Sequence, residues 1–311
     1  MSVIKDNILD IADNHYKYLI NLQNVVGVGF GHKRINEVNT FEPCIHVLVK
    51  DKINSSYILP NNIIPKTFMG IKTDVIEIGT PVAQVIEGFL PEKVRPLKGG
   101  YGISTDSGGT GTIGCIVKKV TKNKVEYFIL SNNHVLAGYN KFSIGSSVFQ
   151  PSKDDHGTDD DIIGNLSAFV RLKFKNKVYT PTNYTDCAIA KISPFIISNE
   201  VEYIGKLKGS ADPIVDSDVF KTGTTSGSTN GQIETIGTTI EINYDNNTKT
   251  ALFKKQITTY IHSEPGDSGS ALVNTNDKVV GLLFSGTDKN MAICNDINLV
   301  LNSLKVEIYT V

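Results

Sequence analysis

The sequence predicts a mainly β protein that begins with a small α/β unit. Helical spacing of apolar residues is confined to residues 3–22 and to one segment near the end, residues 297–304. Beyond the first hundred residues, short apolar runs alternate with turn residues, which is typical of β-barrels. The stretch 95–100, rich in proline and glycine, separates the two patterns and is the expected linker. We therefore expect an N-terminal α/β domain over residues 1–95, regulatory or scaffolding in role, and a β domain over residues 98–311.

The N-terminal region is expected to hold one helix and three strands. These elements should lie at residues 3–22, 24–31, 44–50 and 63–78, the last including a turn. Gly27, Gly29 and Gly31 resemble a nucleotide-binding loop in composition, but they alternate along a strand instead of opening a helix. The region therefore offers no functional site of its own by sequence.

The β region is long enough for two small barrels. Its strands are expected at residues 109–117, 125–130, 146–150, 187–192, 219–227, 231–236, 238–244, 257–261, 271–273 and 279–286. Residues 297–304 are expected to form a short closing helix.

Charge and hydropathy argue against several classes of partner. The chain has 31 basic and 32 acidic residues and a formal net charge of −1, which argues against nucleic acid or an anionic membrane as the main partner. No apolar run approaches the roughly 18–20 residues of a membrane span. Asp6, Asp10 and Asp13 interrupt the start where a secretion signal would be apolar. We therefore expect a cytoplasmic protein, and a homo-oligomer is compatible with this composition.

Two groups of metal-ligating residue types occur, and neither predicts a metal site. The cysteines lack the paired spacing of a zinc motif and are expected to be reduced, buried thiols: Cys44, Cys115, Cys187 and Cys294. The acidic loop 154–161 offers carboxylates that could bind Ca²⁺, but an exposed, solvated loop is the favoured interpretation. We expect no metal and no organic cofactor.

The run Gly266-Asp267-Ser268-Gly269 is the strongest functional signal in the chain. Its small residues permit a tight turn that would hold the Ser268 hydroxyl out of the fold. They would also let the N–H groups of Gly266 and Ser268 point the same way, as an oxyanion hole requires. The competing interpretation is an ordinary turn between two strands.

Two further residues complete a candidate catalytic set. His134 follows an apolar strand at a small-residue turn, and Asp186 precedes a short apolar strand. Asp186 comes 52 residues after His134, and Ser268 comes 82 residues after Asp186. A nucleophilic serine needs a base and a carboxylate that orients the base. Cys187 lies beside Asp186 but lacks the turn of a nucleophile, so a Cys-His pair is not favoured.

This order and spacing resemble those of the chymotrypsin-like serine proteases, in which His and Asp come from the first of two β-barrels and Ser from the second. A narrower resemblance, to intracellular bacterial trypsin-like serine peptidases with the plant Narrow Leaf protease as a distant relative, covers nearly the whole chain. It is carried by the segments 24–29, 73–77, 130–137, 149–152, 265–270 and 281–286. The resemblance implies a chymotrypsin-like double β-barrel preceded by an N-terminal α/β extension.

The resemblance also implies how a substrate would bind. The strand after the serine would pair with the substrate backbone, and by spacing its residues are Phe284, Ser285 and Gly286. His262, six residues before the serine, and its neighbour Ser263 would lie at the side-chain pocket. Because no carboxylate stands there, a trypsin-type preference for Lys or Arg is not expected, and Glu264 should lie at the rim. His262 either contacts an acidic substrate side chain or is a hydrogen-bonded wall residue, and the second is favoured.

The resemblance further suggests how the site is kept competent. In digestive relatives the aspartate before the serine pairs with a newly cut N-terminus, which is not evident here. Lys221, on an expected strand of the second barrel, is the candidate cation that balances Asp267 instead.

The sequence thus predicts a serine endopeptidase that acts on protein or peptide substrates. Ser268 would attack, His134 would act as general base and then acid, and Asp186 would orient the imidazole. Two alternatives remain open: a catalytically silent or latent peptide-binding module on the same fold, and an esterase.

Overall fold

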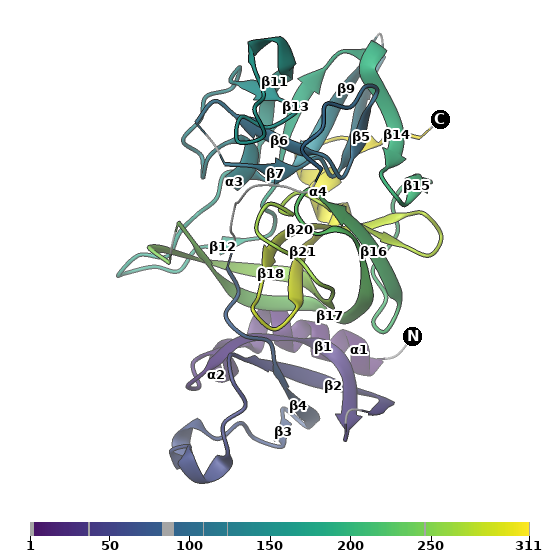
Figure 1. Cartoon of the computed structure of the whole chain (residues 1–311). Coiled ribbons are helices and arrows are strands. Elements are labelled where there is room, and N and C mark those ends of the chain that lie inside the picture. Colours follow the sequence, from purple (N-terminus) through teal and green to yellow (C-terminus); the bar gives the residue numbers. More distant parts are fainter. Residues whose placement is uncertain are drawn as a thin grey trace.

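Two β-barrels and an N-terminal sheet follow one another along the molecule (Figure 1). The computed structural model describes residues 3–36, 38–82, 90–107, 109–122, 124–245 and 247–310. Residues 83–89, at the end of the expected N-terminal domain, lie outside the described residues. In Figure 1 the N-terminal strands lie at the bottom, the second barrel in the middle and the first barrel at the top. The mainly β class predicted from the sequence is confirmed.

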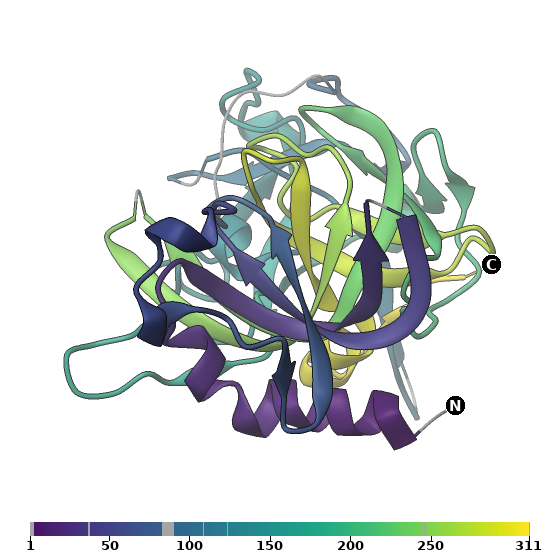
Figure 2. The same ribbon diagram turned by 90° about the horizontal axis from the view of Figure 1, so that it is seen from below.

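The N-terminal helix runs alongside the curved N-terminal strands (Figure 2). It consists of α1 (Val3–Asp10), a π-helical turn η1 (Ile11–His15) and α2 (Lys17–Ile20). Ile8, Ile11 and Leu19 form its buried face and share one apolar cluster with Val28 and Val47 of the strands. Because isolated helices this short are marginal in water, this burial is what stabilises the helix.

The N-terminal strands continue the sheet of the second barrel. They are β1 (Val25–Ile35), β2 (Val38–Val49), β3 (Thr67–Phe68) and β4 (Ile71–Glu77), with 3₁₀ turns η2 (Ser55–Tyr57) and η3 (Pro60–Asn62) between β2 and β3. β1 pairs antiparallel with β17 (Gly227–Tyr244), where Gly27 lies opposite Ile240 and Phe30 opposite Ile236. β2 pairs antiparallel with β1 and parallel with β4. The N-terminal unit and the second barrel therefore share one eleven-stranded sheet.

The second barrel has six strands and closes because β17 pairs with both β16 and β18. Its strands, besides β17, are β16 (Asp218–Gly223), β18 (Lys249–Tyr260), β19 (Ala271–Asn274), β20 (Val279–Gly286) and β21 (Met291–Asp296). The sequence predicts two strands over 231–244, but the structure has the single long strand β17. Its register with β18 shifts between Ile233 and Ile240, and Gly237 there has a φ of 64°. A glycine in this conformation bends a strand without ending it.

The first barrel is built on an eight-stranded sheet. Its strands are β6 (Gly102–Thr105), β7 (Gly111–Thr112), β8 (Cys115–Thr121), β9 (Lys124–Ser131), β10 (Ser147–Phe149), β11 (Ile162–Phe169), β13 (Ala188–Ile192) and β22 (Glu307–Ile308), with 3₁₀ turns η4 (Asp159–Asp161) and η5 (Pro194–Ile196). A small sheet of β5 (Leu97–Gly99), β14 (Ile197–Val201) and β15 (Gly205–Lys206) adjoins it, and β12 (Thr182–Asn183) pairs with β18. Part of the expected linker is therefore strand β5, in which Leu97 is buried.

The closing helix α4 (Ile297–Leu304) lies where the sequence predicts it. Its N-cap Asp296 accepts a hydrogen bond from the Asn298 N–H, and Lys305 ends it in the left-handed conformation with a φ of 56°. Buried α4 residues belong to the apolar cluster that joins strands of both barrels. No helix in the described residues has both the length and the apolar character needed to cross a membrane.

Candidate active site

His134 and Asp186 form a buried pair where two strands of the first barrel meet. β9 leads into one helical turn, α3 (Asn133–Leu136), which carries His134 at the place where the sequence predicts a small-residue turn. Asp186 precedes β13, which pairs with β9. Nδ1 of His134 lies 2.7 Å from Oδ2 of Asp186, and the His134 backbone N–H donates to Oδ1 at 3.2 Å. With a proton on Nδ1 facing the carboxylate, the imidazole keeps its lone pair at Nε2.

Three further side chains hold Asp186. The Tyr244 hydroxyl donates to its Oδ2 at 2.9 Å. Oδ1 of Asn295 accepts from the Asp186 N–H, and the Asn132 amide donates to the Asp186 carbonyl, both at 2.7 Å. Burial, and next the Asp186 charge, raises the pKa of Tyr244 well above its usual value, so the phenol remains a donor. Sequence reasoning missed Tyr244 and Asn295 because they lie on β17 and β21, far from any motif, whereas Asn132 lies within the histidine motif itself.

Ser268 lies on a tight turn that depends on two glycines. Gly266 and Gly269 have φ values of 102° and 99°, a region that glycine adopts most readily. A Cβ on Gly269 would lie 2.2 Å from Oγ of Ser131 and 2.3 Å from the carbonyl oxygen of Thr112. Thr112 also ties the turn to the first barrel, because its N–H donates to the Ser268 carbonyl at 2.8 Å and its hydroxyl to the Gly266 carbonyl at 2.9 Å.

The backbone amides of Gly266 and Ser268 remain available as donors. Within the described residues, neither N–H is engaged by a protein acceptor. The neighbouring amides are occupied: Asp267 N–H donates to the Glu264 carbonyl at 3.0 Å, and Gly269 N–H donates to the Leu283 carbonyl at 2.8 Å. Free amides flanking a serine hydroxyl are what an oxyanion requires.

Ser268 and His134 come from different barrels and are not hydrogen-bonded to each other here. Among the described residues, the buried Nε2 of His134 has no hydrogen-bond partner. Gly111 lies close to both the helical turn that carries His134 and the turn that carries Ser268. A Cβ on Gly111 would be 2.4 Å from the Val135 side chain and 3.1 Å from the Ser268 carbonyl oxygen. Hydrogen bonds between catalytic groups are often long or absent before substrate binds. The structure thus has the His-Asp pair assembled and the serine nearby.

Asp267 is buried and surrounded by donors. Nζ of Lys221 lies 2.9 Å from Oδ2 of Asp267, with both side chains fully buried. The carboxylate also accepts from the Ser226 hydroxyl at 2.6 Å and from the backbone N–H groups of Glu264, Thr225 and Ser226. Burial alone would raise the pKa of Asp267, but the Lys221 charge and these donors outweigh it and hold the pKa below its usual value. The pair that the sequence suggested is present in the fold.

A pocket of about 390 Å³ opens beside Ser268. Its wall includes the predicted residues His262, Ser263 and Gly286, together with Glu264. Nδ1 of His262 lies 3.0 Å from Oδ1 of Asn290, and its Nε2 lies 3.2 Å from Oε1 of Glu264. Both ring nitrogens of His262 therefore already have protein partners. Glu264 is half exposed, as expected of a residue at the rim.

The backbone of Gly286 is occupied by the segment that leads out of the N-terminal unit. The Val82 N–H donates to the Gly286 carbonyl at 3.0 Å, and the Gly286 N–H donates to the Val82 carbonyl at 3.2 Å. Val82 and Thr80 also line the pocket. Ser285 is buried, and the Phe284 ring is buried against Phe253, with ring centroids 4.8 Å apart. Phe284 can therefore offer a substrate only its backbone.

The acidic loop does not gather its carboxylates around one point. Asp154 accepts from the N–H and hydroxyl of Thr110, and Asp155 accepts from the Ser152 hydroxyl. Asp161 is held by Lys93 and by its own turn. The loop is therefore held both by local hydrogen bonds and by bonds from Thr110 and Lys93 outside it, which the sequence did not indicate.

The four cysteines are free and buried. Burial raises the pKa of Cys187 to about 12, so this thiol stays protonated near neutral pH. A protonated, inaccessible thiol is a poor nucleophile, which agrees with the preference for Ser268 over Cys187.

Comparison with solved structures supports the chymotrypsin-like fold that the sequence predicts. Protease A of Thermobifida fusca superposes with a TM-score of 0.50 and 18% identity, covering 69% of this chain and 98% of its own. A Nocardiopsis protease matches with a TM-score of 0.48 and 20% identity, covering 68% of this chain and 98% of its own. A glutamic acid-specific serine protease, described as using a histidine triad in substrate binding, matches with a TM-score of 0.48 and 19% identity, over 68% of this chain and 100% of its own. No curated protein matches the sequence.

Comparison with protein families gives the assignment. The family described as trypsin-like peptidase domain matches residues 109–282, which is more than half of the chain. The matched span contains the buried His134–Asp186 pair and the turn that carries Ser268. The chain therefore belongs to the trypsin-like peptidase domain family.

Proposed function

We propose that this protein is a serine endopeptidase that cleaves peptide bonds through an acyl-enzyme. The observation that carries the proposal is the buried His134–Asp186 pair near Ser268: among the described residues, the imidazole Nε2 and the two amides that flank the serine have no protein partner. These are the base, its orienting carboxylate, the nucleophile and the oxyanion donors that acyl transfer needs.

In the proposed reaction Ser268 Oγ attacks the peptide carbonyl carbon while its proton passes to His134 Nε2. Asp186 holds the imidazole in the required tautomer and stabilises its charged form. The Gly266 and Ser268 amides would hold the oxyanion, each contact of this kind being worth about 3–4 kcal/mol. His134 then protonates the leaving amine, and water releases the acyl group by the same steps in reverse.

We further propose that the N-terminal domain regulates the access of substrate to the pocket beside Ser268. A peptide substrate that paired with Gly286 would use its N–H and carbonyl, and Val82 already bonds to both. Substrate must therefore displace Val82 or bind without Gly286. This gives the expected regulatory role of residues 1–95 a physical basis, since Val82 follows the N-terminal strands in the chain.

We assign His262 to the wall of the side-chain pocket. Its contacts with Asn290 and Glu264 support this role and leave neither ring nitrogen free for an acidic substrate side chain. A library of peptides that varies the residue before the scissile bond tests the assignment. His262→Ala should change kcat/KM for many side chains alike, whereas a selective loss for acidic side chains would contradict it.

We also place the protein with the cytoplasmic peptidases of the bacterial type suggested by the sequence. Four free, buried thiols support a reducing compartment, because disulfides are rare there. Fractionation of the source cells, followed by detection of the protein in the cytosolic or the exported fraction, tests this placement.

The decisive experiment for the enzyme is labelling with a fluorophosphonate, which reacts with activated serines. Wild-type protein should form one adduct at Ser268, located by mass spectrometry, and Ser268→Ala should form none. Ser143→Ala, at an exposed serine outside the site, is the matched control and should label as the wild type does.

The alternatives give different results. No labelling of folded protein, together with peptide binding, would indicate a non-cleaving peptide-binding module and contradict the proposal. Labelling at Ser268 with turnover of activated esters, but of no peptide, would indicate an esterase.

A further inference from the structure

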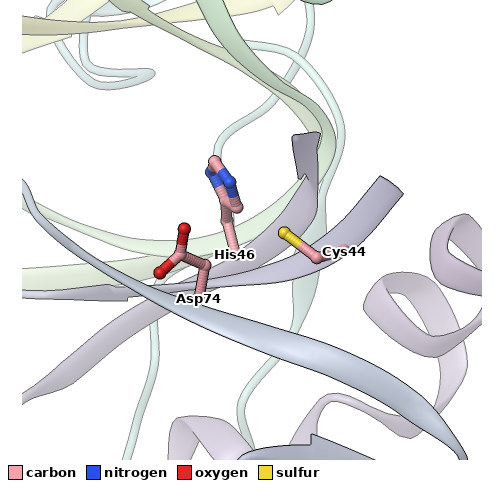
Figure 3. Close-up of side chains that lie close together, drawn as sticks. All are labelled: Cys44, His46 and Asp74. Carbon is pink, nitrogen blue, oxygen red and sulfur yellow. The ribbon is translucent and has the colours of Figure 1, made fainter. Parts of the chain in front are cut away.

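Cys44, His46 and Asp74 project from the same face of the N-terminal sheet (Figure 3). Cys44 and His46 lie two residues apart on β2, so their side chains share a face. Asp74 lies directly opposite His46 in the parallel pairing of β2 and β4. One ligand atom from each of the three residues lies within 4.8 Å of the other two. A thiol, an imidazole and a carboxylate gathered in this way are ligand types that Zn²⁺ accepts.

The His46 ring is oriented as the ring of a metal ligand would be. Its Nε2 lies 2.9 Å from the carbonyl oxygen of His32, and because a carbonyl only accepts, Nε2 carries the hydrogen. Nδ1 is then left with its lone pair. Metal-ligating histidines usually donate their other ring N–H to a carbonyl or carboxylate in this manner.

The Nδ1 lone pair faces a second acceptor, the carboxylate of Glu234. Nδ1 lies 3.3 Å from Oε1 of Glu234, with side-chain exposures of 1% and 2%. Among the described residues, both atoms lack a hydrogen-bond partner. Two buried acceptors attract each other only through a proton or a cation. A ligand separation near 3.3 Å is also about the edge of a tetrahedron with metal–ligand bonds of about 2.0–2.1 Å.

The His46 ring can reach Glu234 because Gly31, over which it lies, has no side chain. Strand β1 lies between β2 and β17 in the sheet, and a Cβ on Gly31 would lie 2.5 Å from Nδ1 of His46. Any other residue at this position would displace the ring. The glycine therefore lets side chains from strands on either side of β1 meet above it.

We propose that Cys44, His46 and Asp74 bind one Zn²⁺ ion, and that Glu234, placed beside His46, moves in as the fourth ligand and so fastens the N-terminal sheet to β17 of the second barrel. The ligand atoms of Cys44, His46 and Asp74 lie within 4.8 Å of one another, so they and Glu234 would draw together to reach zinc bond lengths. The site contains none of the proposed catalytic residues, so it goes beyond the proposed peptidase function.

Arg34 supports the two carboxylates and balances the charge. Its guanidinium bonds to Oε2 of Glu234, which leaves Oε1 free, and its backbone N–H donates to Oδ2 of Asp74 at 2.7 Å. A thiolate and two carboxylates exceed the charge of Zn²⁺ by one, which the Arg34 cation offsets. Asp74 is 16% exposed, which gives the ion a way in from solvent.

The test is metal analysis of the full-length protein after chelation, reconstitution with equimolar ZnSO₄ and gel filtration. Wild-type protein should retain one zinc per chain. Cys44→Ser and His46→Gln should each lower zinc affinity at least tenfold, as should Glu234→Gln, which keeps the shape but not the charge. Cys115→Ser removes an equally buried thiol in the first barrel and is the matched control that should retain zinc.

Cobalt reconstitution gives a second readout that does not depend on stability. Co²⁺ bound by Cys44 should give thiolate-to-metal charge-transfer absorption that disappears in Cys44→Ser and persists in Cys115→Ser. A wild-type protein that retains no zinc would overturn the proposal and indicate a proton shared by His46 and Glu234. Zinc retained by folded Cys44→Ser, or a cobalt spectrum without a thiolate band, would also overturn it.

Discussion

At the scale of single residues, the candidate catalytic groups were predictable and their supports were not. His134, Asp186 and Ser268 each lie in a short run whose local pattern carries the signal. Tyr244 carries no such signal, because it is an inward-facing strand residue that meets Asp186 only when β17 closes the second barrel. A buried carboxylate needs donors, yet the sequence does not say which distant strand supplies them.

Tyr244→Phe should reduce kcat by about tenfold while changing KM little. The substitution keeps the ring and removes one hydrogen bond to a charged group, a contact worth about 1.5–3 kcal/mol, part of which would be felt in the transition state. Steady-state kinetics on a cleaved peptide measure this. Tyr127→Phe is the control: this first-barrel tyrosine makes an edge-to-face ring contact, and loss of its hydroxyl should leave kcat unchanged. Equal kcat for wild type and Tyr244→Phe would show that Asp186 does not need this donor.

At the scale of elements, the turn around Ser268 is held by the Asp267–Lys221 pair. The resemblance suggested this pair, because Asp267 lies in the serine motif and Lys221 lies on an expected strand of the second barrel. The backbone donors from Thr225, Ser226 and Glu264 could not be inferred, since backbone geometry follows from how the loops pack.

Lys221→Ala should destabilise the protein by about 3–5 kcal/mol, because it leaves a buried carboxylate without its cation. Chemical denaturation followed by fluorescence or circular dichroism measures the loss. Lys208→Ala removes the cation of a surface pair with Asp277, in which both side chains are exposed to solvent, and should change stability little. Unchanged stability and labelling in Lys221→Ala would show that Asp267 does not depend on Lys221.

The same turn should give the protein an acid-sensitive component of stability. The pKa of Asp267 is lowered on folding, so its contribution is present above the unfolded-state pKa of about 3.9 and is lost as pH falls through the folded-state value. The free energy of unfolding of the wild type should therefore fall below about pH 4. Asp267→Asn should show a shallower fall in this window, despite lower stability at neutral pH. Parallel slopes for the two proteins would contradict this assignment.

The Val82 contact predicts a change in substrate access. Val82→Pro removes the N–H that donates to Gly286, while Val82→Ala keeps it and serves as the control. A peptidyl phosphonate, which needs Gly286, should label Val82→Pro several-fold faster than wild type. A small fluorophosphonate should label both at the same rate, because it does not reach Gly286. Equal rates with the peptidyl probe would show that Val82 does not compete with substrate.

At the scale of the whole molecule, the sequence predicted the class and the two-part plan but not how the parts join. Composition shifts and the linker suggest a division near residues 95–98, and that division stays a prediction. What the pattern could not indicate is that β1 pairs with β17, because strand pairing between segments this distant leaves no local trace. The cluster of Cys44, His46, Asp74 and Glu234 escaped notice for the same reason, since its members come from three strands.

Deletion of residues 1–95 should destabilise the remaining protein and promote its aggregation. The deletion would expose the β17 edge that pairs with β1 and the part of the second barrel that packs against the helix and strands. Light scattering and thermal denaturation of the 96–311 fragment measure this. A monomeric fragment as stable as the full-length protein would show that the second barrel does not depend on the N-terminal unit.

The continuous sheet also sets the order in which the chain can be completed during synthesis. Strands β1 and β2 leave the ribosome early, but the partner of β1 is the part of β17 that includes Ile236 and Ile240. Until β17 has been synthesised, the apolar strand β1 has no pairing partner on that edge, although much of the first barrel has already been made. Pairings between such distant segments slow folding and prolong exposure to aggregation. Strands β1 and β2 are therefore made well before β17 and are among the last to reach their final place, and a nascent chain should depend on chaperones.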